Sequence, residues 1–365
     1  MIGTYNSLPI FNFRPISNNF LFKMGRKLKI MGTIDLHIKK PSNGFFEQFY
    51  YYKIMLYIIL ILILSFTIIK SFFGYNVPSL SKLKGKNVII TGASTGIGEE
   101  MAYICAKNGA NIVIASRRTN LLEKVASECK NISQNQSIKI VTCDLKHEED
   151  CENLINSSVE FFNEINNKPE IDILILNHAM TLFEHMEFNN PKLMVEKLRN
   201  ITMSNLIGFA TLSHLTIPHM ISKNNNKKEF KSIIVLSSLM SIISLGMSWA
   251  YSTSKAAINS YFISLNEELE YQELHNQIKI TLCHLGSINT ITMRSHTDKY
   301  FQKWLVDYMV LNVELTAKNI LQSGLNGQKE FWYPSYGILL RYAYGIFPGI
   351  MRRIGFWIQR YLITN

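Results

Sequence analysis

The sequence predicts an α/β fold built on a doubly wound sheet of about seven parallel strands. Short runs of Val, Ile and Leu alternate along the chain with longer stretches of helical periodicity. Strands that helices bury on both faces need such uninterrupted apolar runs. The first run leads directly into a glycine-rich turn, which is typical of a Rossmann sheet. The predicted strands are Val88–Ile90, Ile112–Ala115, Ile138–Cys143, Ile171–Leu176, Ile233–Leu236, Ile278–Cys283 and Phe331–Tyr333.

The composition and charge of the chain limit the classes of molecule that it is expected to bind. The chain has 365 residues, of which 47% are apolar, enough for one large domain with extensions. Its net charge is +11, and many basic residues lie before residue 54 and in the C-terminal tail. No nucleic-acid-binding motif contains them, so we expect a membrane surface as partner and no nucleic acid. The five cysteines form no Cys-x-x-Cys pair, so the sequence predicts neither a metal site nor a disulfide framework.

An uncharged apolar run precedes the predicted domain. The run Ile54–Ile69 has sixteen residues and lies between Lys53 and Lys70, with aromatic residues on both sides. As a helix it would be roughly 24 Å long, and snorkelling lysines could extend it toward a hydrocarbon core of about 30 Å. We therefore predict a transmembrane anchor over 46–73, after a flexible basic tail over 1–45. A signal peptide is disfavoured because the run begins deep in the chain, and a core helix because no polar face exists.

Flanking charges predict the orientation of this anchor. More Lys and Arg residues precede the apolar run than follow it in the linker 74–86, which favours a cytoplasmic tail and a luminal domain. We expect a single-pass protein of the endoplasmic reticulum membrane. Four glycosylation sequons suit a lumen, although an asparagine-rich chain produces sequons by chance. They begin at Asn131, Asn135, Asn156 and Asn200.

The glycine-rich turn predicts a phosphate cradle. Gly92, Gly96 and Gly98 follow the first strand in the spacing Gly-x-x-x-Gly-x-Gly, and a helical pattern comes next. Glycine lets the backbone approach a pyrophosphate, and the N–H groups at the start of the helix then face the anion. Such a turn alone could be purely structural. The other candidate cofactor contacts in the turn are Ser94, Thr95 and Ile97.

The end of the second strand predicts the nucleotide. An NAD site usually has an acidic residue there for the ribose 2′-hydroxyl, but this chain has Arg117 and Arg118. A guanidinium can bind a 2′-phosphate through two hydrogen bonds, so we predict NADP(H). The alternative is that both arginines are only solvated. Asp144-Leu145 after the third strand is expected at the adenine, and Asn177 after the fourth near the ribose.

A tyrosine and a lysine four residues apart predict the chemistry. Tyr251 and Lys255 share one face of a helix, and Ser238 ends the preceding strand. A neighbouring ammonium favours the phenolate and can lower a tyrosine pKa of about 10 by about 1 to 3. The serine hydroxyl can hold the substrate oxygen while hydride moves to or from the nicotinamide. Tyr-x-x-x-Lys alone is common in ordinary helices, but here it accompanies the serine and the glycine turn.

Together these motifs resemble the short-chain dehydrogenase/reductase family over about residues 84–335. The resemblance implies that Ser238, Tyr251 and Lys255 are catalytic, with Asn205 holding a proton-relay water. The Asn-Asn-Ala-Gly motif of the family is replaced here by Leu176-Asn177-His178-Ala179. Its Pro-Gly motif is replaced by Leu285-Gly286, and the resemblance places Ile288 and Thr290 at the cofactor.

Within that family, three segments resemble the 11-beta-hydroxysteroid dehydrogenases. They are Leu-Asn-His after the fourth strand, GIGEEMAY at the turn and ITLCHLGSINT late in the chain. This resemblance implies an apolar lipid substrate, steroids first, and a homodimer. Leu239 and Leu245 are expected at the substrate beside Ser238 and Tyr251, although Leu245 stands where those enzymes have a tyrosine. The alternatives are a retinol or other lipid-alcohol dehydrogenase, a 3-ketoacyl reductase-like enzyme and a catalytically silent binding protein.

The segment 336–365 has no acidic residue but several arginines among Tyr, Phe, Trp, Leu and Ile. A basic amphipathic segment of this kind suits a membrane-facing surface. Packing against a second copy of the chain would explain the same composition equally well. We therefore expect a tail that contacts a membrane or the dimer partner.

Overall fold

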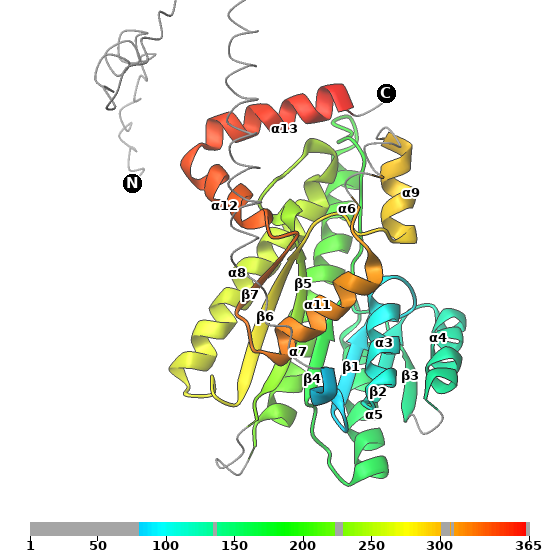
Figure 1. Cartoon of the computed structure of the whole chain (residues 1–365). Coiled ribbons are helices and arrows are strands. Elements are labelled where there is room, and N and C mark those ends of the chain that lie inside the picture. The colour runs from blue at the N-terminus through cyan, green and yellow to red at the C-terminus, as the bar shows by residue number, and fades with distance from the viewer. Residues whose placement is uncertain (1–79, 134–136, 223–228, 301–306, 308–309, 363–365) are drawn as a thin grey trace, which may run out of the picture. The chain divides into compact units, whose positions relative to one another are not determined.

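The computed structural model describes residues 80–133, 137–222, 229–300, 307 and 310–362 (Figure 1). The chain divides into two units, Met1–Phe73 and Gly74–Asn365, and every described residue lies in the second. The predicted tail 1–45 and anchor 46–73 lie outside the described residues, so both stay predictions. Among the helices of the described residues, none is long and apolar enough to cross a membrane.

A sheet of seven strands, all parallel, forms the centre of the second unit, as the sequence predicts. The order of strands is β3-β2-β1-β4-β5-β6-β7, so the direction of winding reverses between β1 and β4. Ligands bind at such a switch point, outside the carboxyl ends of the strands. The strands are β1 (Asn87–Thr91), β2 (Asn111–Ser116), β3 (Ile138–Thr142), β4 (Ile173–Leu176), β5 (Lys231–Ser238), β6 (Ile278–Leu285) and β7 (Glu330–Tyr333).

Helices cover both faces of the sheet (Figure 1). Successive residues of a strand point to opposite faces, so Val88 and Ile90 pack in one apolar cluster and Ile89 in the other. The first cluster includes residues of α3 (Ile97–Lys107), α4 (Thr119–Ile132) and α11 (Val313–Leu325). The second includes residues of α5 (Glu148–Asn166), α7 (Gly208–Met220) and α8 (Trp249–Tyr271). This arrangement explains why the central strands have no polar face.

Several further elements follow the carboxyl ends of the strands, whereas η1 (Leu80–Leu83) precedes β1. A π-helical turn, η2 (Met203–Ile207), joins α6 (Pro191–Thr202) to α7, and π-turns are frequent at functional sites. After β7 the chain forms α12 (Gly337–Ile346) and then α13 (Pro348–Leu362), which lies across the top of the domain in Figure 1. The remaining elements are η3 (Leu239–Ser241), η4 (Gly246–Ser248) and α9 (Ile291–Tyr300).

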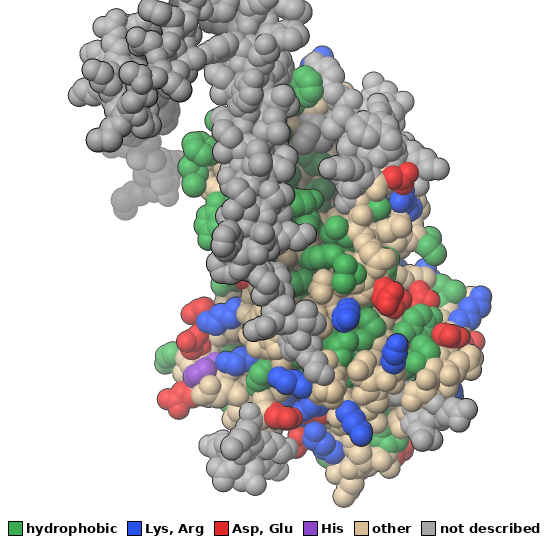
Figure 2. Space-filling model, viewed as in Figure 1, with side chains coloured by type: hydrophobic (Ala, Val, Ile, Leu, Met, Phe, Trp, Pro, Cys, Tyr) green, Lys and Arg blue, Asp and Glu red, His purple; other side chains and the backbone are tan. Residues whose placement is uncertain are grey.

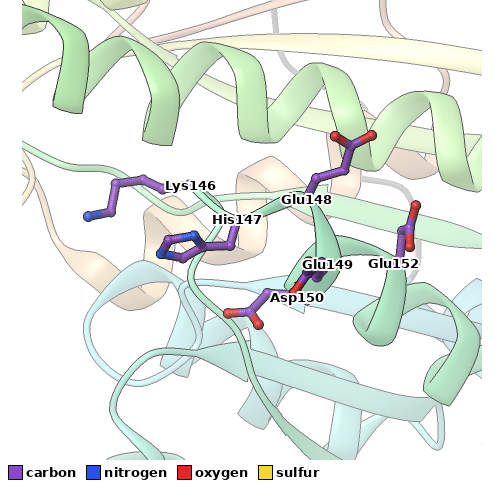
Figure 3. Close-up of a pocket in the computed structure, with 6 residues that line it drawn as sticks. All are labelled: Lys146, His147, Glu148, Glu149, Asp150 and Glu152. Carbon is purple, nitrogen blue, oxygen red and sulfur yellow. The ribbon is translucent and has the colours of Figure 1, made fainter.

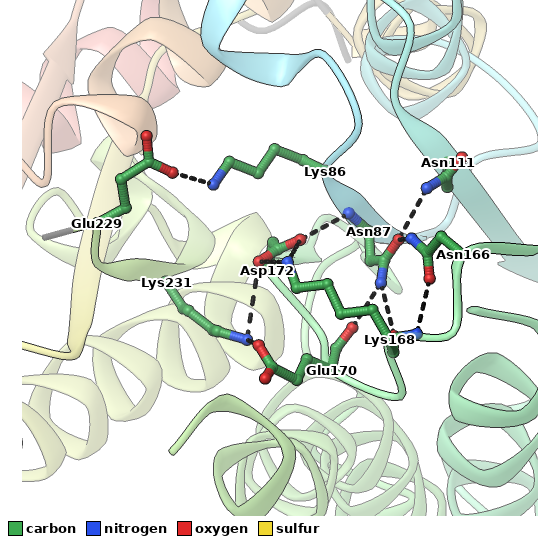
Figure 4. A network of polar contacts seen from close by, with 9 residues as sticks. All are labelled: Lys86, Asn87, Asn111, Asn166, Lys168, Glu170, Asp172, Glu229 and Lys231. Atoms are coloured by element: carbon green, nitrogen blue, oxygen red, sulfur yellow. Dashed lines mark hydrogen bonds and ion pairs between the residues drawn. The ribbon is translucent and has the colours of Figure 1, made fainter. Parts of the chain in front are cut away.

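A polar network fastens the amino ends of β1, β4 and β5, at the opposite edge from the predicted site (Figure 4). The carboxylate of Asp172 accepts hydrogen bonds from the Asn87 backbone N–H at 3.0 Å and from Lys168 Nζ at 2.9 Å. Lys231 is almost fully buried, and its Nζ lies 2.6 Å from Glu170 Oε2 and 3.7 Å from Asp172 Oδ1. Burial lowers the pKa of Lys231, although both carboxylates oppose that shift. The network therefore stabilises the sheet and is remote from the predicted chemistry.

Candidate active site

The predicted phosphate cradle is a tight turn between β1 and α3. Gly92 and Gly96 have φ angles of 64° and 68°, a region that favours glycine. A Cβ atom at Gly98 would lie 2.4 Å from Asn177 Nδ2 and 2.5 Å from the Gly92 carbonyl oxygen. The turn thus needs glycine both for its backbone angles and for close packing. This open backbone at the start of α3 fits the phosphates of a dinucleotide.

Asn177, at the carboxyl end of β4, braces this turn. Its Nδ2 donates to the carbonyl oxygens of Thr91 and Gly92, both at 3.0 Å. Thr91 Oγ1 in turn donates to the Ile175 carbonyl oxygen and accepts from the Asn177 N–H. Asn177 thus holds the end of β1 and the start of the turn, and its predicted position near the ribose stays a prediction. One N–H of the cradle, that of Gly96, donates to Glu99 Oε2 at 3.1 Å.

An arginine connects the end of β2 to the cradle. Nη2 of Arg118 donates to Ser94 Oγ at 2.8 Å and to Thr95 Oγ1 at 2.9 Å. The neighbouring side chain of Arg117 is exposed. The Arg118 guanidinium and the two hydroxyls therefore lie together beside the glycine turn, which is hydrogen-bonding chemistry that fits an anion.

The segment after β3 has a more structural role than the sequence suggested. Asp144 Oδ1 accepts from the Lys146 N–H at 3.2 Å, and the Asp144 N–H donates to Asp150 Oδ2 at 2.8 Å. Leu145 is buried, and a Cβ atom at Gly208 would lie 2.5 Å from its carbonyl oxygen. Leu145 therefore packs under the start of α7. Its predicted contact with adenine stays a prediction, as does that of Asp144.

An acidic hollow lies beside this segment (Figure 3). The four carboxylates among its lining residues outnumber the one lysine. Such a lining disfavours phosphate, so the glycine turn remains the better place for the phosphates of a cofactor. The lining residues are Lys146, His147, Glu148, Glu149, Asp150 and Glu152.

The structure brings Ser238 and Tyr251 together. Ser238 is the last residue of β5, and its Oγ accepts the Met240 N–H at 3.1 Å. Tyr251 lies in the first turn of α8. Burial raises the pKa of Tyr251, and a hydrogen bond with the Ser238 side chain lowers it by a smaller amount. The two hydroxyls can therefore contact one substrate oxygen, as the sequence predicts.

Lys255 lies one turn further along α8, but its ammonium does not act on Tyr251 as expected. Its Nζ donates to the Leu236 carbonyl oxygen at 2.7 Å and lies 5.8 Å from the centre of the Tyr251 ring. Burial lowers the pKa of Lys255 to about 7. The expectation that this ammonium lowers the tyrosine pKa is wrong for this structure, because burial dominates and the net shift of Tyr251 is upward.

Asn205 is fully buried in the π-helical turn and anchors the loop after β4. Its Oδ1 accepts the Met180 N–H at 2.7 Å, and its Nδ2 donates to the Met180 carbonyl oxygen at 2.9 Å. The same Nδ2 donates to Ser254 Oγ at 3.0 Å, on the helix that carries Tyr251. The buried asparagine thus connects two elements of the predicted catalytic centre. Its proposed part in a proton relay stays a prediction.

Thr290 lies beside the cradle, and its expected contact with the cofactor stays a prediction. A Cβ atom at Gly96 would be 3.0 Å from Thr290 Cγ2. Thr290 Oγ1 accepts the Met293 N–H at 3.2 Å in the first turn of α9. Ile288 is buried and forms a parallel bridge with Leu311, which holds this loop in place. Thr290 therefore lies where a contact with a cofactor in the cradle is geometrically possible, and the expected cofactor contact of Ile288 stays a prediction.

The expected substrate residues pack against the C-terminal helices. Leu239 Cδ2 would lie 2.6 Å from a Cβ atom at Gly337, and Leu245 Cδ2 lies 3.7 Å from one at Gly355. The Gly246 N–H donates to Gln359 Oε1 at 3.0 Å. Helices α12 and α13 therefore contact the segment between Ser238 and Tyr251.

Several contacts of the site were not anticipated from sequence. The ring of Phe183 lies 6.0 Å from that of Tyr251, between ring centres, and Phe209 lies 5.5 Å from Lys255 Nζ. His178 Nε2 is 2.7 Å from Ser204 Oγ in the π-helical turn. Burial, then the charges of Arg117 and Lys255, lower the pKa of His178 to about 4. No periodic pattern of residues predicts these contacts, because each joins separate elements of the fold.

The Rossmann sheet, the glycine cradle and the Ser238–Tyr251–Lys255 group together define a nicotinamide-dependent dehydrogenase. The chain belongs to the short chain dehydrogenase family, whose model matches residues 86–300. It is therefore an oxidoreductase of that family, which uses NAD(H) or NADP(H).

Individual relatives are consistent with this assignment. The "Hydroxysteroid 11-beta-dehydrogenase 1-like protein" of Danio rerio is 30% identical over 264 residues, which are 72% of this chain and 84% of the relative. The "11-beta-hydroxysteroid dehydrogenase-like 2" of Arabidopsis thaliana is 30% identical over 256 residues, 69% of this chain and 74% of the relative. A crystal structure of a short-chain type dehydrogenase/reductase from Mycobacterium marinum has a TM-score of 0.56 at 21% identity. It covers 69% of this chain and 95% of the other, and it supports the fold.

Proposed function

We propose that this protein is a membrane-anchored, NADP(H)-dependent oxidoreductase acting on a ketone or hydroxyl of an apolar lipid, steroids first. The observation that carries the cofactor choice is Arg118, which bridges Ser94 and Thr95 at 2.8 and 2.9 Å. This guanidinium and that of Arg117 follow β2, where an NAD site would have a carboxylate. A 2′-phosphate there would meet two cations and two hydroxyls.

The field of these arginines extends into the cleft. The charges of Arg117 and Arg118 both contribute to lowering the pKa of His178. A positive field at this rim attracts the additional two negative charges of a 2′-phosphate and gives the uncharged 2′-hydroxyl no comparable gain. We therefore expect a preference for NADPH over NADH of at least about tenfold, which corresponds to about 1.4 kcal/mol.

The chain's own groups fit proton transfer to a carbonyl oxygen. When bound, a nicotinamide supplies or accepts the hydride. Tyr251 donates the proton to the carbonyl oxygen in reduction, and Ser238 orients that oxygen by a hydrogen bond. Because burial raises its pKa, Tyr251 is protonated at neutral pH and suits the role of acid. Asn205 holds the loop after β4 in register with α8.

An apolar substrate is supported by the side chains around Tyr251 and by the names of the relatives. The ring of Phe183 lies beside that of Tyr251, and the segment between Ser238 and Tyr251 contributes the apolar Leu239 and Leu245, so a sugar would find few hydrogen-bonding partners. Two relatives are named as hydroxysteroid dehydrogenase-like proteins. A retinol or other lipid-alcohol dehydrogenase and a 3-ketoacyl reductase-like enzyme share this chemistry. A catalytically silent binding protein would have no need of the intact Ser238, Tyr251, Lys255 and Asn205 group.

Helices α12 and α13 support contact with a membrane. Hydrophobic side chains gather in the upper part of the face shown in Figure 2, and charged ones over the lower part. Five apolar side chains of these helices and their connection are more than half exposed, and Arg352, Arg353 and Arg360 are also exposed. The five are Tyr342, Ile346, Phe347, Ile350 and Phe356. We propose that this surface lies on the luminal leaflet of the endoplasmic reticulum membrane, with 46–73 as anchor, and that the protein is a homodimer.

The experiment measures turnover and cofactor affinity of the purified full chain with NADPH and NADH. A panel of ketones includes a steroid, a long-chain ketone, a 3-ketoacyl thioester, retinal and a small polar ketone. We expect NADPH to be preferred and the steroid to be reduced best. Arg118→Ala should reduce the preference for NADPH at least about tenfold, whereas the control Arg199→Ala on α6 should leave it unchanged. Equal use of both cofactors by the natural protein would overturn the cofactor proposal, and best turnover of the polar ketone would overturn the substrate proposal.

A further inference from the structure

Two of the five cysteines lie on either side of one loop at the edge of the cleft. Cys143 directly follows β3, and Cys151 lies in the first turns of α5. Sγ of Cys143 donates to the Asp150 carbonyl oxygen at 3.5 Å, and Sγ of Cys151 contacts the Leu145 carbonyl oxygen at 4.0 Å. Each thiol therefore contacts the backbone within two residues of the other cysteine. The two thiols also shift each other's pKa, upward for Cys143 and downward for Cys151.

Other bonds close the same loop and hold the pair in place. The Asp144 N–H donates to Asp150 Oδ2 at 2.8 Å, and the His147 N–H donates to the Asp144 carbonyl oxygen at 2.9 Å. Both cysteines are buried in the apolar cluster formed with α5 and α7. Because folding already brings the two sulfurs near each other, forming a bond between them costs little further conformational entropy. All five cysteines are free thiols in this structure.

The two thiols differ in reactivity. The hydrogen bond from Cys143 lowers the pKa of Cys151 and correspondingly raises that of Cys143. The thiolate is the nucleophile in thiol–disulfide exchange, and the first turns of a helix also favour it. Because Cys151 lies in the first turn of α5, between two residues that line the acidic hollow, it is the attacking thiol, and Cys143 is placed to resolve the mixed disulfide.

The acidic hollow of Figure 3 lies next to this pair and selects the oxidant. Asp150 and Glu152, the neighbours of Cys151 in sequence, both line it. Four carboxylates against one lysine repel an anionic disulfide and attract a cationic one. The first turn of α5 begins with the exposed residues Glu148 and Glu149, so a local opening there can admit a small molecule.

We propose that Cys143 and Cys151 form a reversible disulfide by exchange with a small cationic disulfide. The Cys151 thiolate attacks the small disulfide, forms a mixed disulfide and releases one small thiol. Cys143 then attacks the Cys151 sulfur of the mixed disulfide, which forms the Cys143–Cys151 bond and releases the second small thiol. Two protein thiols are oxidised and one small disulfide is reduced to two thiols, so atoms and electrons balance. This modification site is independent of the proposed substrate and cofactor.

The structural consequence is a covalent closure of the loop that contains Asp144 and Leu145. Cross-linking a loop of this length restricts the unfolded chain, and we expect the melting temperature to rise by about 5 °C. In an oxidising compartment the pair would be a disulfide, and in a reducing one a dithiol. The state of the pair would therefore also report the compartment that the domain occupies.

The test treats the folded full chain with cystamine, blocks the remaining thiols and maps the peptides without reduction. We expect a peptide pair joined through Cys143 and Cys151, lighter by two hydrogen atoms than the two peptides, and removal of the link by dithiothreitol. The control Cys129→Ser should leave the link intact, because Cys129 lies on α4 in the other apolar cluster. Cys151→Ser and Cys143→Ser should each abolish both the link and the rise in melting temperature.

Glutathione disulfide, which is anionic, provides a second measurement. We expect it to react at least about tenfold more slowly than cystamine at low salt, with the difference decreasing as salt is added. No Cys143–Cys151 link after cystamine treatment of the folded protein would overturn the proposal. A link formed equally fast with both reagents would overturn the role of the acidic hollow.

Discussion

The ammonium of Lys255 donates a hydrogen bond of 2.7 Å to the carbonyl oxygen of Leu236. This lysine is almost fully buried, and its Nζ lies 5.5 Å from the centre of the Phe209 ring. The contact holds α8, which carries Tyr251, against β5, which ends at Ser238. The contact also costs free energy, because a charge is removed from water with only one hydrogen bond in return.

The burial of Lys255 should make stability depend on pH. Its pKa is about 7 in the folded protein, below its ordinary value of 10.5. Below pH 7 both states carry the proton, so the cost of burying the charge is fully present. Between pH 7 and 10.5 the unfolded state binds more protons, so the contribution of Lys255 to stability becomes more favourable as pH rises.

Lys255→Met tests this dependence through the free energy of unfolding. We expect the variant to gain stability relative to the natural protein by up to about 4 kcal/mol more at pH 6 than at pH 10. The lost bond to Leu236 is a constant term and does not alter this difference. Lys329→Met removes an exposed lysine and should show no such trend. A difference between variant and natural protein that stays constant with pH would contradict the lowered pKa.

Tyr251→Phe should abolish catalysis without loss of cofactor affinity. The ring remains beside Phe183, but the proton donor is gone, so turnover should decrease by about 10²–10⁴-fold. Titration with NADPH, followed by its fluorescence, should give a dissociation constant within about twofold of the natural one. Tyr261→Phe on the same helix removes only a hydroxyl that bonds His214 and should retain activity. Normal turnover in Tyr251→Phe would mean that another group supplies the proton.

Local sequence patterns were sufficient to predict the sheet and the positions of the main motifs. Each apolar run became a strand, buried on both faces in the centre of the sheet and only partly buried in β3 at its edge. Tyr251 and Lys255 share a helix face because they are four residues apart. The ends of strands were less predictable. β5 extends to Lys231 and to Ser238, polar residues whose burial depends on partners elsewhere in the chain.

Contacts between distant segments could not be read from the sequence. Arg118 reaches Ser94 across 24 positions, and Gln359 reaches Gly246 across 113. Periodicity carries no information about such pairs, because the fold alone brings them together. The pKa of Tyr251 was mispredicted for the same reason: the spacing to Lys255 is local, whereas burial depends on the whole fold.

Gly98→Ala should disrupt the phosphate cradle. The new methyl group would lie 2.4 Å from Asn177 Nδ2 and 2.5 Å from the Gly92 carbonyl oxygen, and backbone cannot yield as a flexible side chain can. We expect destabilisation of about 1–3 kcal/mol and at least about tenfold weaker cofactor binding. Calorimetry and cofactor titration measure the two effects.

Gly345→Ala is the matched control for this substitution. Gly345 lies in α12, and a Cβ atom there would meet nothing within 4 Å. The helix should gain about 0.5–1 kcal/mol from the substitution, with unchanged cofactor affinity. Equal cofactor affinity in both alanine variants would contradict the assignment of the glycine turn as the cradle.

Asp172→Asn should destabilise the fold but leave the chemistry unchanged. Asp172 accepts bonds from Asn87 and Lys168 and lies 3.7 Å from the buried Lys231, at the far edge of the sheet (Figure 4). Removing one partner of a buried charge typically costs about 3–5 kcal/mol. Denaturant unfolding should show this loss, with kcat of the remaining folded protein within about twofold of the natural value.

The control variant Glu229→Gln breaks the exposed pair with Lys86 and should cost about 0–1 kcal/mol. Equal losses in both variants would contradict the importance of burial here.

Gln359→Leu should affect the substrate more than the cofactor. Oε1 of Gln359 accepts the N–H of Gly246, three residues before α8 begins, and a Cβ atom at Gly246 would lie 2.8 Å from Gln359 Nε2. The amide thus packs flat on the loop that precedes the catalytic helix. Loss of a hydrogen bond in this partly exposed position costs about 1 kcal/mol, so the KM of an apolar ketone should rise about fivefold.

The loop can shift in this variant, but α8 remains held by Lys255 and by the bond between Asn205 and Ser254. We therefore expect kcat and the dissociation constant of NADPH to stay within about twofold of the natural values.

The control variant Gln272→Leu, at the other end of α8, removes a bond to Glu268 and should leave KM unchanged. Steady-state kinetics with one apolar and one small polar ketone measure the effect. We expect the KM of the polar ketone to be the same in Gln359→Leu and in the natural protein, because this small molecule does not extend to Leu245. A fall in kcat with unchanged KM would instead mean that Gln359 helps to align Tyr251 and does not affect substrate binding.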